Sequence, residues 1–344
     1  MLGMSRKIGS LAVTDVGLGC MGFSHAYGPA MERAEAVRLI RSAFEMGYSF
    51  FDTAECYRGL DAEGRESLNE ELVGEALRPV REQVVIATKC GVTHLPGRQQ
   101  RLDSSPAMIR RSVEGSLKRL GVDCIDLYYQ HRIDPRVEPE VVAETMGELI
   151  REGKIREWGI SEVGEEYLRR AHAVCPVAAI QNRYSMMARW YEKLFPTLEE
   201  LGVAFVAFSP LANGVLSCEF EMQHAENDYR HGMPQFSPEG VEKSRALRGL
   251  LQQVAEVKQA TPAQVAMAWL LARRPYIIPI PGSRRETRLR ENFGAASVRL
   301  TAEEYSEISA RLETMELPVY GKASSSEVSG RREALSAKKI EKKS

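Results

Sequence analysis

Four residues in the first half of the chain have side chains that together can deliver a proton to a developing oxyanion: Asp52, Tyr57, Lys89 and His131. A phenol with a pKa near 10 releases its proton poorly at neutral pH, and a neighbouring ammonium group stabilises the phenolate. Lys89 is a candidate for that ammonium, and Asp52 for the counter-charge that a buried lysine needs. A histidine within reach can polarise a carbonyl oxygen or join a proton relay. The four side chains therefore indicate an acid that protonates a carbonyl oxygen as hydride reaches the carbonyl carbon.

Each of these residues also has an ordinary structural interpretation. An aspartate that ends a strand is more often a helix cap or turn former, and a lone tyrosine usually belongs to the core or rim. A strand-end lysine is as often a surface residue, and a single histidine is more often structural. The recurrence of these residues after three successive strand-like runs is what favours one shared site.

Short apolar runs alternate with amphipathic segments from Val16 to Phe293. Near-continuous apolar runs are typical of parallel strands that are covered on both faces. The runs are Gly17–Met21, Tyr48–Asp52, Val84–Lys89, Ile125–His131, Lys154–Ser161, Val177–Gln181, Val203–Ser209 and Tyr276–Gly282. Helix start signals fall between them, because Ser105 precedes Pro106 and Thr261 with Gln264 forms a capping-box pattern.

Strands that alternate with helices form either a (β/α)8 TIM barrel or a doubly wound open sheet. An open sheet binds its ligand with a few adjacent strands, whereas a barrel gathers all carboxyl ends of its strands around one mouth. Seven of the runs end in, or lead directly into, a polar residue: Asp52, Lys89, His131, Ser161, Gln181, Ser209 and Ser283. We therefore predict an α/β fold of the (β/α)8 type that occupies residues 1–320 as one domain.

Three segments lie outside the alternation. Residues Lys7–Val13 are predicted to form a short hairpin that closes the bottom of the barrel. The long loop Leu211–Gly240, after the seventh strand, is predicted to be a lid or binding loop. Residues 321–344 are rich in Ser, Lys, Arg and Glu, and we expect a disordered, solvated C-terminal tail rather than one that contacts an acidic partner.

The composition narrows the class of protein. The chain has 46 Lys and Arg residues and 47 Asp and Glu residues. A protein that binds nucleic acid by neutralising phosphates normally has an excess of basic residues, which this sequence lacks. The six cysteines form no CxxC pair, which argues against a zinc cage or a disulfide framework and fits a reducing compartment. No apolar stretch has the length of a membrane span. We expect a cytoplasmic protein with no metal, nucleic-acid or membrane partner; its oligomeric state stays open.

Seven segments, in order along the chain, resemble motifs of the aldo-keto reductase superfamily. They are FFDTAECY (Phe50–Tyr57), ATKCG (Ala87–Gly91), DLYYQHRID (Asp126–Asp134), GKIREWGISE (Gly153–Glu162), AIQNRYS (Ala179–Ser185), FSPLANGVL (Phe208–Leu216) and IPIPGSRRETRLRENFGA (Ile278–Ala295). The similarity spans about residues 5–315 and is strongest to the perakine reductase and pyridoxal reductase-like branch.

The resemblance implies a barrel without a Rossmann glycine fingerprint that binds NADPH in extended form across its mouth. It implies a catalytic tetrad of Asp52, Tyr57, Lys89 and His131, in which Tyr57 is the general acid, Lys89 lowers its pKa and His131 orients the carbonyl. The implied cofactor residues are Ser161 and Gln181 at the carboxamide, Phe208 beneath the nicotinamide, and Ser209, Leu211 and Gly214 near the pyrophosphate. Ser283, Arg284 and Arg288 would bind the 2′-phosphate, and Glu291 and Asn292 the adenine. Phe208 stands where the family usually has tyrosine, but stacking needs only the ring face.

The phosphate end also has support from the residues themselves. Gly282-Ser283-Arg284-Arg285 is predicted to open a helix after the eighth strand, where free backbone N–H groups favour an anion. Arg284 and Arg288 are four residues apart, so we expect both guanidinium groups on one helical face, next to a phosphate.

The substrate pocket is expected to be built from loops. Its candidates are Phe23, His25 and Tyr27 after the first strand, Val92–Leu102 after the third, Trp190, and the Leu211–Gly240 loop. Their aromatic and apolar character favours an aromatic or alkyl aldehyde or ketone.

The leading hypothesis is an NADPH-dependent carbonyl reductase. One alternative is a lyase or aldolase that uses Lys89 as a Schiff-base nucleophile. Another is an NADPH-binding redox sensor or interaction protein with vestigial catalysis. A metal hydrolase is disfavoured, because no paired histidines occur at metal-ligand spacing.

Overall fold

The computed structural model describes residues 6–95, 99–221 and 228–320, so the predicted tail at 321–344 lies outside the described residues. One sheet contains eight strands in the order β14-β13-β12-β11-β10-β7-β4-β3, and neighbours along it pair in parallel. The strands are β3 (Leu18–Gly19), β4 (Phe50–Asp52), β7 (Val85–Cys90), β10 (Ile125–Gln130), β11 (Ile155–Ser161), β12 (Ala179–Arg183), β13 (Ala204–Phe208) and β14 (Ile277–Pro279). Each of them lies within or overlaps one of the apolar runs.

The two end strands of this sheet are joined by backbone hydrogen bonds. The N–H of Gly17 donates to the carbonyl of Pro279 at 3.0 Å, and the N–H of Gly19 donates to Pro281 at 3.1 Å. A Cβ at Gly19 would lie 2.8 Å from the carbonyl oxygen of Ile280, so this close approach requires a glycine. The sheet is thereby closed, and the predicted (β/α)8 barrel is confirmed.

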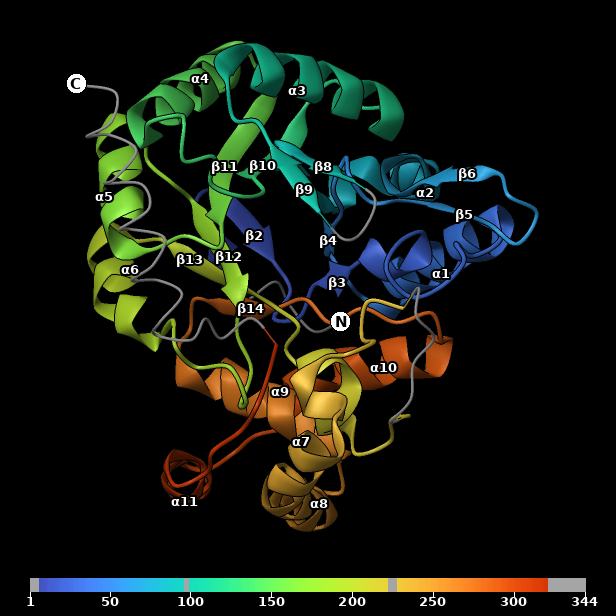
Figure 1. Cartoon of the computed structure of the whole chain (residues 1–344), viewed down its shortest axis with the longest axis vertical. Helices are drawn as coiled ribbons and strands as arrows, with labels where there is room; N and C mark the ends of the chain where they lie inside the picture. The colour runs from blue at the N-terminus through green and yellow to red at the C-terminus, as the bar shows by residue number, and fades with distance from the viewer. Residues whose placement is uncertain (1–5, 96–98, 222–227, 321–344) are drawn as a thin grey trace, which may run out of the picture.

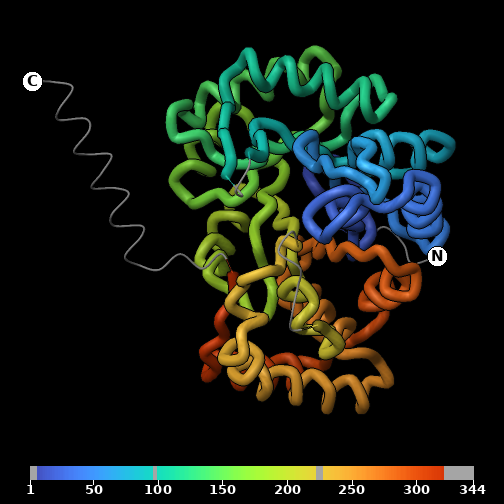
Figure 2. The backbone as a smooth tube through the Cα atoms, turned by 45° about the vertical axis from the view of Figure 1, so that its right-hand side comes forward, coloured from blue at the N-terminus to red at the C-terminus, as the bar shows by residue number. Residues whose placement is uncertain are grey.

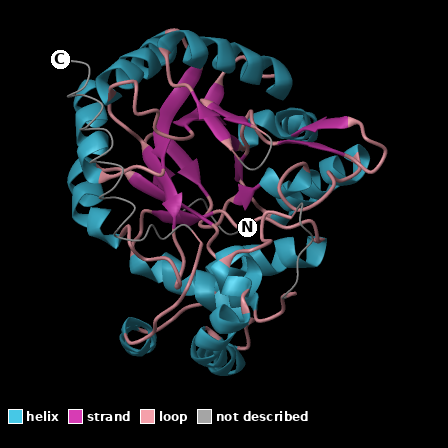
Figure 3. Ribbon diagram, in the orientation of Figure 1, coloured by secondary structure: helices cyan, strands magenta, loops and turns pink. Residues whose placement is uncertain are grey.

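Helices surround the strands on the outside (Figures 1 and 3). Those that follow the eight strands in turn are α1 (Arg33–Met46), α2 (Asn69–Leu77), α3 (Pro106–Leu120), α4 (Pro139–Arg151), α5 (Glu165–Val174), α6 (Phe195–Leu201), α9 (Pro262–Arg273) and α10 (Glu286–Gly294). Three more helices are α7 (Pro238–Lys243), α8 (Arg245–Lys258) and α11 (Ala302–Glu313). Helices α1 and α10, from opposite ends of the chain, lie side by side (Figure 2), and Arg38 bonds to Glu286 across them at 2.9 Å.

The predicted helix starts are present. The Ser105 hydroxyl accepts from the N–H of Met108, and Pro106 occupies the first turn of α3. Thr261 and Gln264 form the reciprocal capping box at the start of α9. Such caps satisfy backbone N–H groups that have no partner inside the helix. None of the helices in the described ranges has the length and apolar character that crossing a membrane requires.

The predicted hairpin consists of β1 (Arg6–Ile8) and β2 (Leu11–Val13), which pair antiparallel. Ile8, Leu11 and Val13 are buried and pack with the inward-facing side chains of the barrel strands. In Figure 1, β2 lies behind the barrel strands, within the ring of helices. The hairpin therefore closes the amino-terminal end of the barrel and leaves the opposite end as the mouth.

The predicted long loop Leu211–Gly240 follows β13 and has more local structure than the sequence indicated. It contains short 3-10 turns at Ala212–Ser217 and Pro234–Phe236, and α7 begins inside it. The physical reason is a start signal that the prediction did not use, because the Ser237 hydroxyl accepts from the N–H of Gly240 and Pro238 fills the first turn. Part of the segment lies against the β3–α1 loop, where the N–H of Tyr229 donates to the carbonyl of Ala26 at 2.6 Å.

Candidate active site

The structure brings the four predicted catalytic residues together at the carboxyl ends of β4, β7 and β10. Asp52 ends β4, Lys89 lies near the end of β7 and His131 directly follows β10. Alternation along each strand turns these side chains inward, and the loop after β4 brings Tyr57 back over them. All four side chains are buried, and Lys89 is fully so.

The Lys89 ammonium group has three N–H donors and three acceptors. Its Nζ lies 2.5 Å from Asp52 Oδ1, 2.6 Å from the Thr53 carbonyl oxygen and 3.3 Å from Tyr57 Oη. The other Asp52 oxygen, Oδ2, accepts from Gln181 Nε2 at 2.7 Å. A buried ammonium and a buried carboxylate are each expensive unless their hydrogen bonds are satisfied, and here both are. Because Tyr57 Oη accepts from Lys89, its own O–H stays free to donate.

The pKa of Tyr57 is raised well above its ordinary value of 10. Burial is the largest cause, and the negative charge of Asp52 adds to it. The net direction is therefore opposite to a lowered pKa, and the lowering contribution expected from Lys89 stays a prediction. The reason is that the Asp52 charge accompanies the Lys89 charge, so the pair does not outweigh desolvation of the phenolate. Tyr57 is a neutral, proton-carrying phenol at neutral pH.

His131 is a neutral imidazole in this site. Burial is the first cause that lowers its pKa well below 6.5, followed by the positive charges of Arg132 and Lys89. Its Nδ1 lies 3.4 Å from the Sγ of Cys56, and burial raises the pKa of that thiol to about 12. A thiol S–H that donates to Nδ1 places the imidazole proton on Nε2, and Nε2–H is the form that can donate to a substrate oxygen.

A cavity of about 1800 Å³ opens over these residues. Pockets for a single small molecule are typically about 300–1,000 Å³, so this cavity has room for a dinucleotide and a substrate together. Asp52, Tyr57 and His131 line the cavity, whereas Lys89 is not among its lining residues. All of the predicted cofactor residues line it: Ser161, Gln181, Phe208, Ser209, Leu211, Gly214, Ser283, Arg284, Arg288, Glu291 and Asn292.

At the mouth of the barrel, Ser161 and Gln181 present complementary groups. Gln181 commits its NH₂ group to Asp52, so its Oε1 is left to accept. The Ser161 hydroxyl accepts from Arg132 Nη1 at 3.0 Å, so its O–H is left to donate. One acceptor beside one donor matches the NH₂ and C=O of a carboxamide. Phe208, at the end of β13, lines the same region.

The turn after β13 has a strained backbone. Ser209, Ala212, Asn213 and Gly214 have φ values of 53°, 49°, 60° and 113°. Left-handed conformations at non-glycine residues are uncommon, and they concentrate at ligand sites. The side chain of Asn213 holds the turn, because its Oδ1 accepts from Gln235 Nε2 at 3.2 Å and from Arg183 Nη1 at 3.4 Å.

The predicted phosphate end differs from expectation in one respect. Helix α10 begins at Glu286, so Arg284 precedes the helix and does not share a helical face with Arg288. Arg284 instead turns toward the β3–α1 loop, where it donates to the carbonyls of Gly22 at 2.5 Å and Pro29 at 2.8 Å. Its Nη2 is buried with no hydrogen-bond partner in the described part of the chain. A buried guanidinium N–H without an acceptor, next to a helix N-terminus, fits an anionic group.

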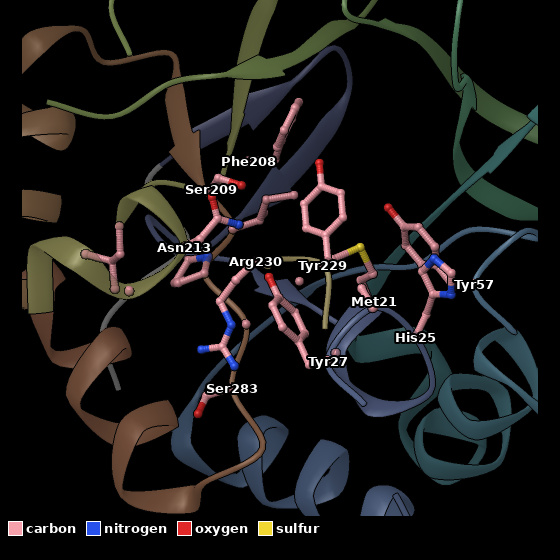
Figure 4. Close-up of a pocket in the computed structure, with 18 of the residues that line it drawn as sticks. Met21, His25, Tyr27, Tyr57, Phe208, Ser209, Asn213, Tyr229, Arg230 and Ser283 are labelled. Carbon is pink, nitrogen blue, oxygen red and sulfur yellow. The ribbon is translucent and has the colours of Figure 1, made fainter. Parts of the chain in front are cut away.

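Of the four single residues predicted for the substrate pocket, two line the cavity and two do not. His25 and Tyr27 line it, and the His25 ring is stacked on Tyr57 at 5.8 Å between centroids (Figure 4). Phe23 is instead 1% exposed in the hydrophobic core, because the 3-10 turn Met21–Phe23 directs it inward. Trp190 packs at the periphery against Tyr191 and is not among the cavity-lining residues.

Sequence reasoning missed three residues on or beside the cavity, which are Cys56, Arg132 and Arg183. Tyr229 lies in the predicted pocket loop Leu211–Gly240 and lines the cavity. In the view of Figure 4, Tyr229 lies between Phe208 and Tyr57. The position of Arg183 could have been predicted, because it lies two residues after Gln181 on the same strand and therefore on the same face of the sheet. Among the described residues, no group of three or more His, Cys, Asp and Glu side chains is arranged to hold a metal ion.

Comparison with known proteins places the chain among similar sequences and structures. The model of the aldo/keto reductase family matches residues 15–313. An aldo-keto reductase of Strobilurus tenacellus is 37% identical over 327 residues, which cover 91% of this chain and 93% of that protein.

Solved structures of aldo-keto reductases are similar along nearly the whole chain. The glycerol dehydrogenase of Gluconobacter oxydans superposes with a TM-score of 0.81 at 26% identity, covering 94% of this chain and 100% of that one. A holo aldo-keto reductase of Bacillus halodurans gives 0.74 at 28% identity, covering 92% and 98%. An aldo/keto reductase of Klebsiella pneumoniae in complex with NADP and acetate gives 0.68 at 26% identity, covering 92% and 98%.

Proposed function

The chain belongs to the aldo/keto reductase family of oxidoreductases, and from that premise we propose that it reduces aldehydes or ketones to alcohols with NADPH. One observation carries the proposal. The Tyr57 hydroxyl accepts a hydrogen bond from the Lys89 ammonium and faces a large cavity with its own proton free to donate. A neutral His131 faces the same cavity.

NADPH, when bound, supplies the hydride, and the residues of the chain do the rest. His131 donates from Nε2 to the carbonyl oxygen of the substrate and orients it toward Tyr57. As negative charge develops on that oxygen, Tyr57 gives up its proton, and Lys89 stabilises the phenolate that forms. Asp52 holds Lys89 in place through the 2.5 Å ion pair.

The cofactor preference follows from the chemistry of the two ends of the cavity. We propose that Ser161 and Gln181 hold the carboxamide, Phe208 stacks under the ring, and Ser209, Leu211 and Gly214 contact the pyrophosphate. Ser283, Arg284 and Arg288 would bind the 2′-phosphate, with Glu291 and Asn292 at the adenine. The buried, unpaired Nη2 of Arg284 supports a phosphate there and so favours NADPH over NADH. The NADP-bound relative from Klebsiella pneumoniae supports the same cofactor.

A Schiff-base lyase has less support. Lys89 is fully buried, is not among the cavity-lining residues and uses all three of its N–H donors, so a carbonyl substrate cannot reach a free amine there.

The other assignments rest on the sequence. We propose a place near the perakine reductase and pyridoxal reductase-like branch from the motif resemblance, and a single catalytic domain over residues 1–320. Six free cysteines support a reducing, cytoplasmic setting. The proposed partner is a small carbonyl compound.

A substrate panel tests the proposed function. NADPH oxidation is measured with aryl aldehydes, aliphatic aldehydes, quinones and pyridoxal, for the wild type and Tyr57→Phe. We expect turnover with at least one class, and a loss of about 10²- to 10⁴-fold in kcat in the variant while NADPH still quenches protein fluorescence. Unchanged function of the variant would instead favour the redox sensor.

A further inference from the structure

Arg132 is a cation on the cavity wall that has no carboxylate partner in the described part of the chain. It follows His131 directly and lines the cavity. Its Nη1 donates to the carbonyl of His131 at 2.6 Å and to the Ser161 hydroxyl at 3.0 Å, and both acceptors are neutral. Over residues 6–95, 99–221 and 228–320, no Asp or Glu forms an ion pair with Arg132.

Most other arginines that line the cavity either form an ion pair with a carboxylate or lie at the proposed phosphate site. Arg58 pairs with Glu66, Arg230 with Asp228, and Arg288 with both Glu291 and Glu219. Arg284 and Arg285 precede α10, at the end of the cavity to which we assign the phosphate.

Arg183 also lacks an ion pair with any carboxylate that the structure describes, but aromatic rings cover it. Its guanidinium lies 4.9 Å from the Phe208 ring centroid and 5.5 Å from that of Tyr320. Such cation–π contacts compensate a buried guanidinium. Beside the proposed catalytic histidine, Arg132 is thus the cation with neither an ion pair nor a ring contact within the described residues.

None of the carboxylates that the structure describes on the cavity wall bonds to Arg132. The side chain of Glu162, also on the cavity wall, accepts from the backbone N–H of Arg183 at 3.0 Å and from the Tyr191 hydroxyl at 3.4 Å. Tyr57 and Tyr229 are neutral phenols. A half-buried guanidinium in such surroundings is a strong site for an anion, because the low dielectric strengthens a charge-assisted hydrogen bond.

We propose that Arg132 binds a carboxylate of the substrate, so that the preferred substrates are aldehydes or ketones that carry a carboxylate. The inference rests on the proposed reductase function. Because Arg132 is the chain neighbour of His131, the anion lies close to the reacting carbonyl, and a single aromatic ring or a short alkyl spacer connects the two groups. The role is one of specificity: Arg132 positions the substrate and takes no part in proton transfer.

Two matched substrates test the proposal. 4-Formylbenzoate and 4-formylbenzamide have nearly the same shape and differ in charge. For the wild type we expect kcat/KM for the benzoate to exceed that for the benzamide by about 10-fold or more, and to fall as salt is added. Arg132→Met should lower the benzoate value by about 10- to 100-fold and change the benzamide value by less than about 3-fold. Arg132→Lys should recover part of the loss, because it restores the charge without the planar fork.

Arg245→Met is the control, since it removes the same charge from an exposed surface pair with Glu242. It should leave both substrates unchanged. A wild type without charge preference, or an Arg132→Met variant that loses both substrates equally, overturns the proposal even though reduction of the benzamide upholds the reductase function. If neither aldehyde is reduced, the proposed function fails on these substrates, and benzoate binding to the enzyme with NADPH decides the anion site. Benzoate affinity equal in wild type and Arg132→Met then rejects the site, and a loss of about 10-fold or more in the variant supports it.

Discussion

The Tyr57 hydroxyl and the Lys89 ammonium group are joined by a 3.3 Å hydrogen bond in which the ammonium donates. The direction of this bond fixes what each residue can do. Tyr57 keeps its proton for a partner in the cavity, and Lys89 stays out of reach of any ligand. This geometry supports the proposed roles of Tyr57 as the acid and Lys89 as its support, and the burial of Lys89 disfavours a Schiff base there.

The raised pKa of Tyr57 predicts different pH profiles for the two directions of the reaction. Reduction needs the phenol, which is present at every pH below the raised pKa, so kcat for reduction should be flat from about pH 6 to about pH 9. Alcohol oxidation needs the phenolate, so its kcat should rise about tenfold per pH unit over the same range, provided that chemistry limits the rate. A reduction rate that titrates away near pH 7 would contradict this assignment.

Removal of Lys89 alone should destabilise the fold. Lys89→Met leaves Asp52 as a buried carboxylate without its cation, which typically costs about 3–5 kcal/mol. The double variant Asp52→Asn/Lys89→Met removes both charges and should recover most of that loss. Urea denaturation of the two variants and the wild type measures the difference. Equal stability of the single and the double variant would show that the pair does not act as a unit.

Cys56 is predicted to hold His131 in its Nε2–H form. Cys56→Ala removes the donor to Nδ1, so kcat should fall about 10-fold while KM for NADPH is unchanged. Cys56→Ser restores a donor of similar size and should recover the rate.

The pH profile separates this positioning role from simple packing. Loss of the thiol donor frees Nδ1 to take a proton more easily, so the acid limb of kcat should move to higher pH in Cys56→Ala and return in Cys56→Ser. A serine variant as slow as the alanine variant would argue against the assigned tautomer.

His131 also predicts how stability depends on pH. Its pKa in the folded protein lies well below the ordinary 6.5, so below pH 6.5 the unfolded chain takes up a proton that the folded protein refuses. The free energy of unfolding should therefore fall as the pH drops from 6.5, by up to about 1.4 kcal/mol per unit for this residue. Denaturant melts at pH 7.5 and 5.5 should show a smaller fall for His131→Gln; an equal fall would assign the acid sensitivity to other groups.

Arg284 should discriminate between the two nicotinamide cofactors. Arg284→Gln is expected to weaken NADPH binding by about 10-fold and to leave NADH binding nearly unchanged, since only NADPH has the 2′-phosphate. Fluorescence quenching by each cofactor measures both affinities. Because Arg284 also bonds to the carbonyls of Gly22 and Pro29, an equal loss for both cofactors would indicate a purely structural role.

The sequence was sufficient for features that depend on periodicity. Parallel strands bring their carboxyl ends to one place, so Asp52, Lys89 and His131 could be assigned to a common mouth from their positions alone. The cap residues Ser105 and Thr261 could also be predicted, because a helix cap is an interaction between residues that are close in sequence.

Features that depend on contacts between residues far apart in the chain could not be predicted from the sequence. The direction of the Tyr57 pKa depends on how fully the site is buried and on the charge pairing of Lys89. The inward direction of Phe23 depends on a single turn, and Arg284 lost its expected place because α10 begins two residues later. Whether Arg132 has an ion pair depends on all the side chains that surround it in the fold, and no sequence pattern predicts that arrangement.

The backbone hydrogen bonds of Gly17 and Gly19 with the end of β14 and the residues just after it have a consequence for biosynthesis. The tetrad is complete in sequence by residue 131, yet the wall that completes its chamber is made by residues near 280. A ribosome must therefore extend the chain by roughly another hundred and fifty residues, more than four-fifths of the total, before the ring can be fastened. Until then the four residues lack an enclosure, so we expect the proposed reduction to begin only when the last strand joins the first.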